Sequence, residues 1–305
     1  MFILIFEQLV KMFLILLLAF LCYRIGLVTQ EGNKSVSNLL LMVVNPVLII
    51  TVYQTEYRPE LVRSLLLSFA AAAAAHILGI ILSTVLIRPK SGDDYCIERF
   101  CAMYSNCGFI GIPLLGSVLG DTGIFFLTAY MVMFNLFSWT HGIILMEKRL
   151  SLKNLREGFL SPMVLSTILA VVLFFLKIRI PAVLLDSMNY IADMNTPLAM
   201  MVAGFSVAQA DIGKMCRNLH IYFNSAIKLV ILPLCTVPML MLLRLPTDVS
   251  MTVLIAAACP TATLGTMMAI RYRQNYTYAS EMFALSTILS LITLPVMVFI
   301  GELAL

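Results

Sequence analysis

Charged residues are scarce in this chain: they make up 12% of its 305 residues, whereas hydrophobic residues make up 61%. A soluble domain typically has about 25% charged and about 45–50% apolar residues, so the composition excludes an ordinary soluble fold. The net charge of +4 is small and does not indicate nucleic-acid binding. Low-complexity tracts and Ser- or Gly-rich linkers are absent as well. The composition therefore predicts a multi-pass membrane protein with short connections between its spans.

Several chemistries also lack the residues that they need. The seven cysteines form no Cys-x-x-Cys pair or Cys/His cluster, so the sequence indicates neither a zinc site nor a disulfide framework. The three histidines, His76, His141 and His220, are scattered, and no Gly-x-Ser-x-Gly motif is present, which argues against an intramembrane enzyme. A Gly-x-x-x-x-Gly-Lys-[Ser/Thr] motif is missing too, so ATP hydrolysis is not expected. We expect no enzyme activity, no cofactor and no bound metal.

Apolar stretches are abundant, and a stretch of roughly 20 residues can cross a bilayer. The sequence predicts ten spans, at 4–23, 36–54, 62–87, 98–119, 122–146, 159–177, 182–208, 219–243, 249–270 and 277–301. One set of alternating loops holds thirteen Lys and Arg residues and the opposite set, with the tails, holds six. Because positive residues stay in the cytoplasm, both termini are predicted to lie outside the cell (inner or plasma) membrane.

Helix-breaking residues interrupt the fourth and ninth predicted spans. A bilayer offers no water to unpaired backbone groups, so broken helices survive there only inside protein or beside a cavity. We interpret these breaks as the crossover of two discontinuous helices. The crossover residues are Ser105, Gly111, Pro113, Cys259 and Gly265, and the candidate substrate-binding residues are Asn106, Cys107, Gly108, Pro260, Thr261 and Thr263.

An internal repeat is visible in the second and seventh spans. Asn45 and Pro46 lie in the middle of one, and Asn195 and Pro197 lie in the middle of the other; the two prolines are 151 residues apart. The breaks show a similar offset, so the sequence predicts two five-helix repeats, 1–150 and 151–305, with scaffold and transport subdomains formed from both. Because five is odd, the second repeat crosses the membrane in the inverted direction. Inverted repeats place a substrate near the bilayer midplane.

A buried carboxylate must have its lost hydration replaced. The half-helices that begin after each break offer N–H groups and a partial positive charge, whereas those that end there offer carbonyls that can hold a cation. Asn106 adds an amide, and Thr261 and Thr263 add hydroxyls. Apolar walls rich in Met and Phe suit an aliphatic or aromatic tail. We also expect the thiols of Cys107 and Cys259 to lie beside the central cavity.

Lys228 is a cation inside the eighth span, where a charge is costly and usually functional. Its alternatives are coupling, a scaffold ion pair or carbonyl cap, and snorkelling to the interface. Asp193 is a candidate partner and the first carboxylate to test for proton coupling. Asn45 and Asn195 are expected to satisfy the carbonyls that Pro46 and Pro197 free, with ligand contact as the alternative.

With these motifs in place, the chain resembles the bacterial auxin efflux carrier family, which shares its fold with the plant PIN auxin carriers. The resemblance extends over nearly the whole length, in the stretches 23–28, 106–114, 197–204, 228–233 and 258–260. It departs at Ser161-Pro162, where Asn-Pro is frequent, and at 273–275, where Gly-x-Asp is common. The resemblance implies an all-α fold like that of bile-acid symporters, in which helices 4 and 9 cross, helices 2 and 7 belong to the scaffold, and access alternates by an elevator-like or rocking motion.

In PIN carriers an Asn at the crossover contacts the substrate carboxylate, and Asn106 matches it; the neighbouring Pro of that pattern is Ser105 here. The leading hypothesis is a secondary active transporter of small or amphipathic organic anions, driven by an H⁺ or Na⁺ gradient or by the membrane potential. A sodium-coupled bile-acid-type symporter and a non-transporting membrane sensor are alternatives. The oligomeric state stays open, with a homodimer as one option.

Overall fold

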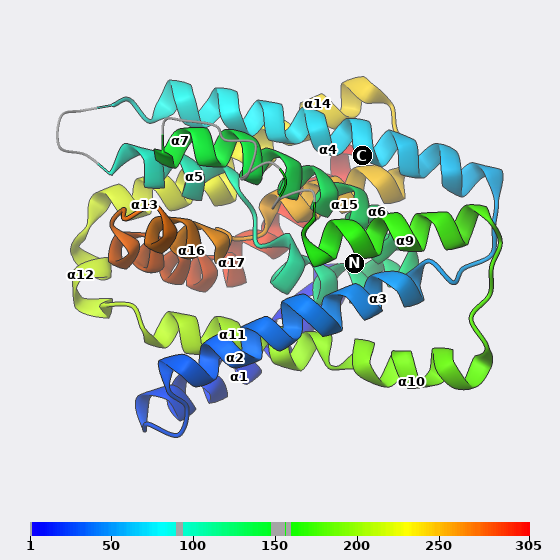
Figure 1. Cartoon of the computed structure of the whole chain (residues 1–305). Helices are drawn as coiled ribbons and strands as arrows, with labels where there is room; N and C mark the ends of the chain where they lie inside the picture. The colour runs from blue at the N-terminus through cyan, green and yellow to red at the C-terminus, as the bar shows by residue number, and fades with distance from the viewer. Residues whose placement is uncertain (1, 90–93, 148–155, 157–159) are drawn as a thin grey trace.

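The computed structural model describes residues 2–89, 94–147, 156 and 160–305. Within these ranges the regular secondary structure is helical apart from one isolated β-bridge, and the helices lie largely alongside one another (Figure 1). Among the described residues, seven helical runs are long and apolar enough to cross a membrane, and these are Ile5–Arg24, Gln30–Val52, Pro59–Leu86, Cys107–Glu147, Ala182–Ala208, Leu219–Leu243 and Tyr276–Ala304. The all-α, multi-pass class is thus confirmed, whereas the predicted count of ten spans is not.

The first half begins with α1 (Phe2–Arg24) and a second helix made of α2 (Gln30–Leu39), η1 (Leu40–Val44) and α3 (Asn45–Val52). The predicted start at residue 36 is wrong: the Thr29 hydroxyl accepts a hydrogen bond from the Gly32 N–H and caps the helix six residues earlier. The next helix, α4 (Pro59–Leu86), has Pro59 in its first turn, where the missing N–H costs nothing.

The next segment contains the first break. It comprises α5 (Tyr95–Met103), η2 (Cys107–Gly111), α6 (Ile112–Phe137), η3 (Ser138–Gly142) and α7 (Ile143–Glu147). Gly120 inside α6 has φ 60° and ψ −153°. Residues with side chains rarely adopt such a positive φ, so glycine is required here for its backbone. This turn separates the predicted spans 98–119 and 122–146.

The second half contains the second break. Its helices are α9 (Pro162–Phe175), α10 (Ala182–Asp193), α11 (Asn195–Ala208), α12 (Ile212–Arg217), α13 (Leu219–Ala226), η4 (Ile227–Ile231), α14 (Leu232–Leu243), α15 (Thr247–Ala258), α16 (Leu264–Arg271) and α17 (Tyr276–Ala304). Among them, α9 and α15 are shorter apolar helices. The predicted ninth span, 249–270, is therefore split between α15 and α16.

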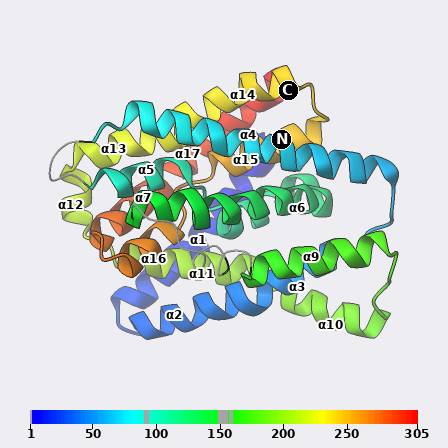
Figure 2. The ribbon, with the colours of Figure 1, turned by 45° about the horizontal axis from the view of Figure 1, so that its top comes forward.

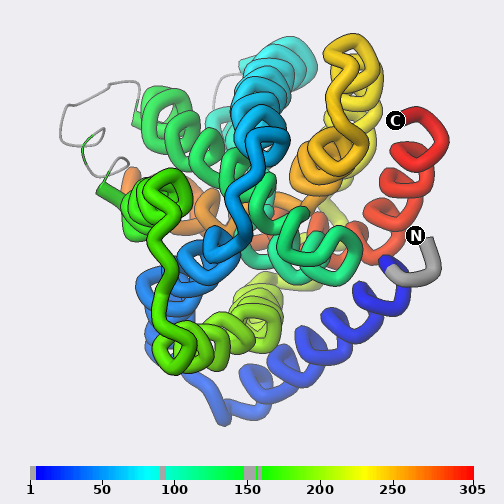
Figure 3. Tube along the Cα trace, turned by 90° about the vertical axis from the view of Figure 1, so that its right-hand side faces the viewer, coloured from blue at the N-terminus to red at the C-terminus, as the bar shows by residue number. Residues whose placement is uncertain are grey.

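The helices of the two halves interleave instead of forming two separate bodies (Figure 2). α1 packs along α11 of the other half, and α4 packs against both α6 and α15. A Cβ atom on Gly204 would collide with the backbone oxygen of Leu16, so glycine allows the close approach of α11 to α1. The termini lie near each other, since α1 also packs on α17 (Figure 3). This interleaving brings the two breaks to the centre of the molecule.

Candidate functional site

The two breaks touch. Ser105 and Thr261 form an antiparallel bridge, the Asn106 N–H donates to the Pro260 carbonyl at 2.7 Å, and the Ala262 N–H donates to the Tyr104 carbonyl at 2.9 Å. The N–H and carbonyl groups of each unwound segment thereby find hydrogen-bond partners in the other segment, as buried peptide groups require. The predicted broken, crossing helices are confirmed, and their antiparallel course fits two oppositely directed halves.

The sequence explains why the helix unwinds at the second break, between α15 and α16. Pro260 has no N–H and disfavours helical geometry at the residue before it, and Cys259 is accordingly extended at ψ 148°. Thr261 then makes two bonds: its hydroxyl donates to the Cys101 carbonyl at 2.9 Å, and its N–H donates to Ser286 Oγ at 3.2 Å. Pro260 and Thr261, predicted to bind substrate, instead hold the two breaks together.

Lys228 lies directly behind the crossover. Its side chain is 0% exposed, and Nζ donates to Ser105 Oγ at 2.6 Å and to the Ala257 carbonyl at 2.7 Å. It therefore contacts both breaks at once. Asp193, the predicted partner, is exposed at the end of α10 and is not bonded to Lys228, so that pairing is wrong. The carbonyl cap among the predicted alternatives is the one observed.

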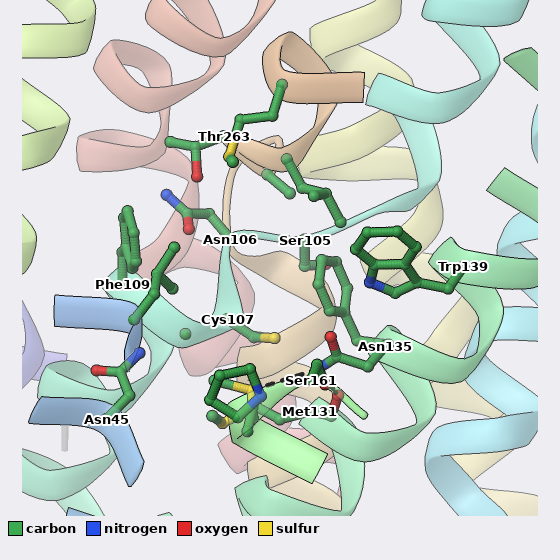
Figure 4. A pocket seen from close by; sticks show the side chains of 18 of the residues that line it. Asn45, Ser105, Asn106, Cys107, Phe109, Met131, Asn135, Trp139, Ser161 and Thr263 are labelled. Carbon is green, nitrogen blue, oxygen red and sulfur yellow. Dashed lines mark hydrogen bonds between the residues drawn. The ribbon is translucent and has the colours of Figure 1, made fainter. Parts of the chain in front are cut away.

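A cavity of about 700 Å³ opens beside the first break. Figure 4 shows Asn106 and Thr263 on one side of it, Asn45 on a second, and Asn135 with Trp139 opposite. Asn106 is 5% exposed, and its Nδ2 has no hydrogen-bond partner among the described residues. An unpaired buried amide costs about 1–3 kcal/mol. Such a donor at a cavity wall is available for a ligand acceptor.

Of the predicted substrate-binding residues, the structure places Asn106, Cys107, Gly108 and Thr263 in the cavity wall, together with the crossover residue Ser105. Gly111, Pro113, Cys259 and Gly265 do not line it. A Cβ on Gly111 would lie 3.6 Å from Cys259 Sγ, which places that thiol in the packing behind the break. The expectation that both thiols adjoin the cavity is therefore right for Cys107 and wrong for Cys259.

Gly265 and Pro113 have packing and backbone roles. Gly265 sits at the start of α16, where a Cβ would lie 3.3 Å from Cys101 Sγ, so a small residue lets α16 approach α5. Pro113 occupies the first turn of α6. Both therefore shape the breaks without facing the cavity.

Asn45 and Asn195 bond to each other. Asn195 Nδ2 donates to Asn45 Oδ1 at 2.7 Å, and both side chains are buried. The expectation that they cap carbonyls freed by Pro46 and Pro197 is wrong. Instead, the pair links the second and seventh predicted helices, one from each half. Asn45 also lines the cavity, and its Nδ2 has no partner among the described residues, so it offers a second amide there.

Several lining residues are ones that sequence reasoning did not identify. The cavity is also lined by Asn135 and Trp139, near the end of the first repeat, and by Arg156 and Ser161, near the start of the second. Asn135 is anchored, because its Nδ2 donates to the Met131 carbonyl at 2.8 Å. Arg156 is exposed and is the cation among the described lining residues. The one feature of the sequence that could have pointed to this wall is Trp139, because it is the single tryptophan of the chain.

A second, more polar cavity of about 580 Å³ adjoins the first and shares Leu41, Phe109, Thr263 and Met267 with it. Its polar lining comes from the ends of four helices and consists of Gln30, Glu31, Asn33, Lys34, Ser37, Asn38, Ser206, Gln209, Thr266 and Ser280. These residues form a polar approach to the crossover from the side of the loop before α2.

The opposite side is closed by aromatic packing. Tyr53 of the second helix bonds through its hydroxyl to Thr128 Oγ1 at 2.7 Å, and its ring lies 4.5 Å from that of Phe125. Phe174 of α9 packs edge-on against Tyr53 at 6.1 Å. Arg179 donates to the Gln54 carbonyl beyond this cluster. Among the described residues, this packing covers the crossover on the side of Tyr53.

A family model described as membrane transport protein matches the chain twice, over residues 4–153 and 149–298. The chain belongs to this membrane transport protein family. It is 25% identical over 217 residues to a protein of Escherichia coli strain K12 named uncharacterized transporter YfdV, over 67% of this chain and 68% of the relative. Proteins of the same name from E. coli O157:H7 and Shigella flexneri match equally.

These matches confirm the resemblance to the auxin efflux carriers and show a transporter instead of an enzyme. The repeated match also agrees with two homologous halves. The cavity beside the crossing breaks is the candidate transport site of this family member.

Proposed function

We propose that this protein is a secondary active transporter of small or amphipathic organic anions, with carboxylates as the substrate class. The observation that supports this most strongly is Asn106, which lines a cavity beside the meeting point of two broken helices and whose buried Nδ2 has no hydrogen-bond partner among the described residues. A carboxylate accepts hydrogen bonds and donates none, so it fits unpaired amide donors. Asn45 and Thr263 would complete the polar end of the site.

Fixed charges of the site also favour an anion. The helix that starts at Cys107 directs its N-terminal end, with about half a positive charge, toward the cavity wall formed by Cys107 and Gly108. Arg156 supplies a full positive charge at the cavity, where it would attract anions from solution. The remaining wall is largely apolar and includes Met131, Phe134, Trp139 and Met163, which suits an apolar substrate tail.

The two cavities and the aromatic closure support alternating access. We assign the polar approach to the cytoplasmic side, because it adjoins the connection between α1 and α2, which Arg24 and Lys34 flank. The Tyr53, Phe125 and Phe174 cluster then closes the outer side. Transport requires these contacts to open while the inner side closes, by an elevator-like or rocking displacement of the crossover relative to the helices that carry Asn45 and Asn195.

The proposal is tested with purified protein in liposomes, offered a panel of radiolabelled mono- and dicarboxylates under imposed proton gradients, sodium gradients and membrane potentials. We expect saturable uptake of at least one carboxylate. Asn106→Ala removes a charge-assisted hydrogen bond worth about 1.5–3 kcal/mol, so kcat/KM should fall by roughly 10- to 150-fold.

The matched control is Asn189→Ala, which changes the same residue type on the exposed face of α10. It should transport at the wild-type rate and unfold at the wild-type temperature, and Asn106→Ala, which loses an unpaired buried amide, should unfold at that temperature or higher. Wild-type kinetics in Asn106→Ala would remove this residue from the site. Absence of uptake for every carboxylate under every gradient would refute the function.

A further inference from the structure

Lys228 places a positive charge in the interior of the protein, and substrate binding alone does not explain how that charge is stabilised. Its ammonium group is fully buried, and no carboxylate of the described residues forms an ion pair with it. Burying an ammonium group away from water is costly unless polar groups replace its hydration. Its two acceptors are Ser105 Oγ and the Ala257 carbonyl, one at each break.

The Ala257 carbonyl is free because α15 ends there. In a continuous helix this oxygen would accept from the N–H of Thr261, but that N–H donates to Ser286 Oγ instead. The carbonyl therefore belongs to the C-terminal end of a half-helix, which carries about half a negative charge. Ser105 follows the C-terminal end of the other half-helix, α5. Lys228 thus lies where two unwound helices present their cation-attracting ends.

Half-helix ends and unwound carbonyls of this kind coordinate the coupling cation in cation-driven carriers. We propose that the Lys228 ammonium is a resident cation that permanently fills this position, so that the protein moves its anion without binding sodium. The π-helical segment η4 supports such a role, because it re-aims the side chain within an otherwise regular helix and is a feature frequent at functional sites.

Ser105 links this cation to the cavity. Its hydroxyl accepts from Lys228, and the same residue lines the cavity wall. An anion in the cavity is thus separated from the ammonium group by one hydroxyl and supplies the missing negative charge. This step rests on the proposed function, whereas the occupancy of the cation position by Lys228 does not.

The test uses the thermal unfolding of purified protein in detergent, without any transport substrate. Lys228→Ala removes a propylammonium fragment with both hydrogen bonds of its ammonium group and leaves Ser105 Oγ and the Ala257 carbonyl with only their mutual 3.3 Å bond, so the unfolding temperature should fall by about 5 °C or more. Millimolar propylammonium chloride should restore at least half of the loss, and tetramethylammonium chloride, which has no N–H donor, should not. Exposed Lys214 gives the control: Lys214→Ala should show neither effect.

Sodium provides the second arm. The unfolding temperature of the wild type should be the same in sodium chloride and in choline chloride at equal ionic strength. If Lys228→Ala does not fold, Lys228→Met keeps the apolar stem and should still be less stable than the wild type. The proposal is overturned if sodium specifically stabilises the wild type, if Lys228→Met is as stable as the wild type, or if propylammonium affects Lys228→Ala and Lys214→Ala equally.

The two proposals fail separately. A protein that passes these tests but transports no carboxylate retains its resident cation and loses only the proposed substrate class. One that transports a carboxylate only with sodium retains the proposed function and loses the inference about Lys228.

Discussion

The backbones of the two breaks do the same thing, since each hydrogen-bonds to the other, but their side chains have different roles. At the first break, Asn106, Cys107 and Gly108 form part of the cavity wall, and the Asn106 amide is unpaired. At the second, Pro260 and Thr261 are buried and bonded to the first break. Two matching halves thus meet as unlike partners. The first supplies most of the groups for a ligand. The second supplies Thr263 and holds the unwound backbone of the first through Pro260 and Thr261.

This difference teaches that a helix break inside a membrane protein is not by itself a binding site. Each break must have its freed peptide groups satisfied, and that requirement uses most of the polar atoms at the second break. Ligand binding is left to polar atoms that remain unpaired. Thr261 and Thr263 illustrate the contrast within a single break, since only Thr263 faces the cavity.

The largest difference between holding the breaks together and lining the cavity is expected in the stability of Thr261 and Thr263 variants. Thr261→Val leaves the buried Cys101 carbonyl unpaired, so the free energy of unfolding should fall by about 1–3 kcal/mol. Thr263 has no side-chain hydrogen bond among the described residues, so Thr263→Val should change it by less than about 0.5 kcal/mol. Denaturant unfolding of the two purified variants checks this.

Transport should show the reverse order. Losing one substrate hydrogen bond of about 0.5–1.5 kcal/mol raises KM roughly two- to tenfold in Thr263→Val. Folded Thr261→Val should keep a KM near that of the wild type. Equal stability losses in both variants would contradict the separation of roles.

A smaller effect is expected for the two thiols. Both residues are buried, at 1% exposure for Cys107 and 0% for Cys259, but Cys107 lines the cavity and Cys259 does not. A small membrane-permeant maleimide should therefore label Cys107 slowly and Cys259 hardly at all. A transported carboxylate should slow the labelling of Cys107. Mass spectrometry of the labelled protein, with Cys107→Ser as the control, measures both rates; faster labelling of Cys259 would reverse the assignment.

The sequence was sufficient for the all-α membrane class and for both breaks. These features depend on composition and on local backbone chemistry, because Pro and Gly act on their own neighbourhood. Paired positions such as Asn106 and Pro260 were also recognisable from their spacing. The direct hydrogen bond between these two residues shows that the spacing reflects a real contact.

What the sequence could not specify was which polar groups pair with one another. Asn45 bonds to Asn195, and Lys228 bonds to Ser105 and Ala257, across separations that no local pattern encodes. Trp139 and Asn135 were equally hidden, because an aromatic or amide side chain in an apolar stretch has the same sequence pattern whether it packs or faces a cavity. Tertiary packing alone decides between these outcomes.

The most direct test of the central claim uses Trp139, the single tryptophan of the chain, which lines the cavity. Its fluorescence is titrated with the carboxylates of the panel in the wild type and in Asn106→Ala. We predict a saturable change for the transported carboxylate in the wild type and a dissociation constant at least about tenfold weaker in the variant. A change that is identical in both proteins, or none for a carboxylate that is transported, would contradict an anion site at the crossing of the two breaks.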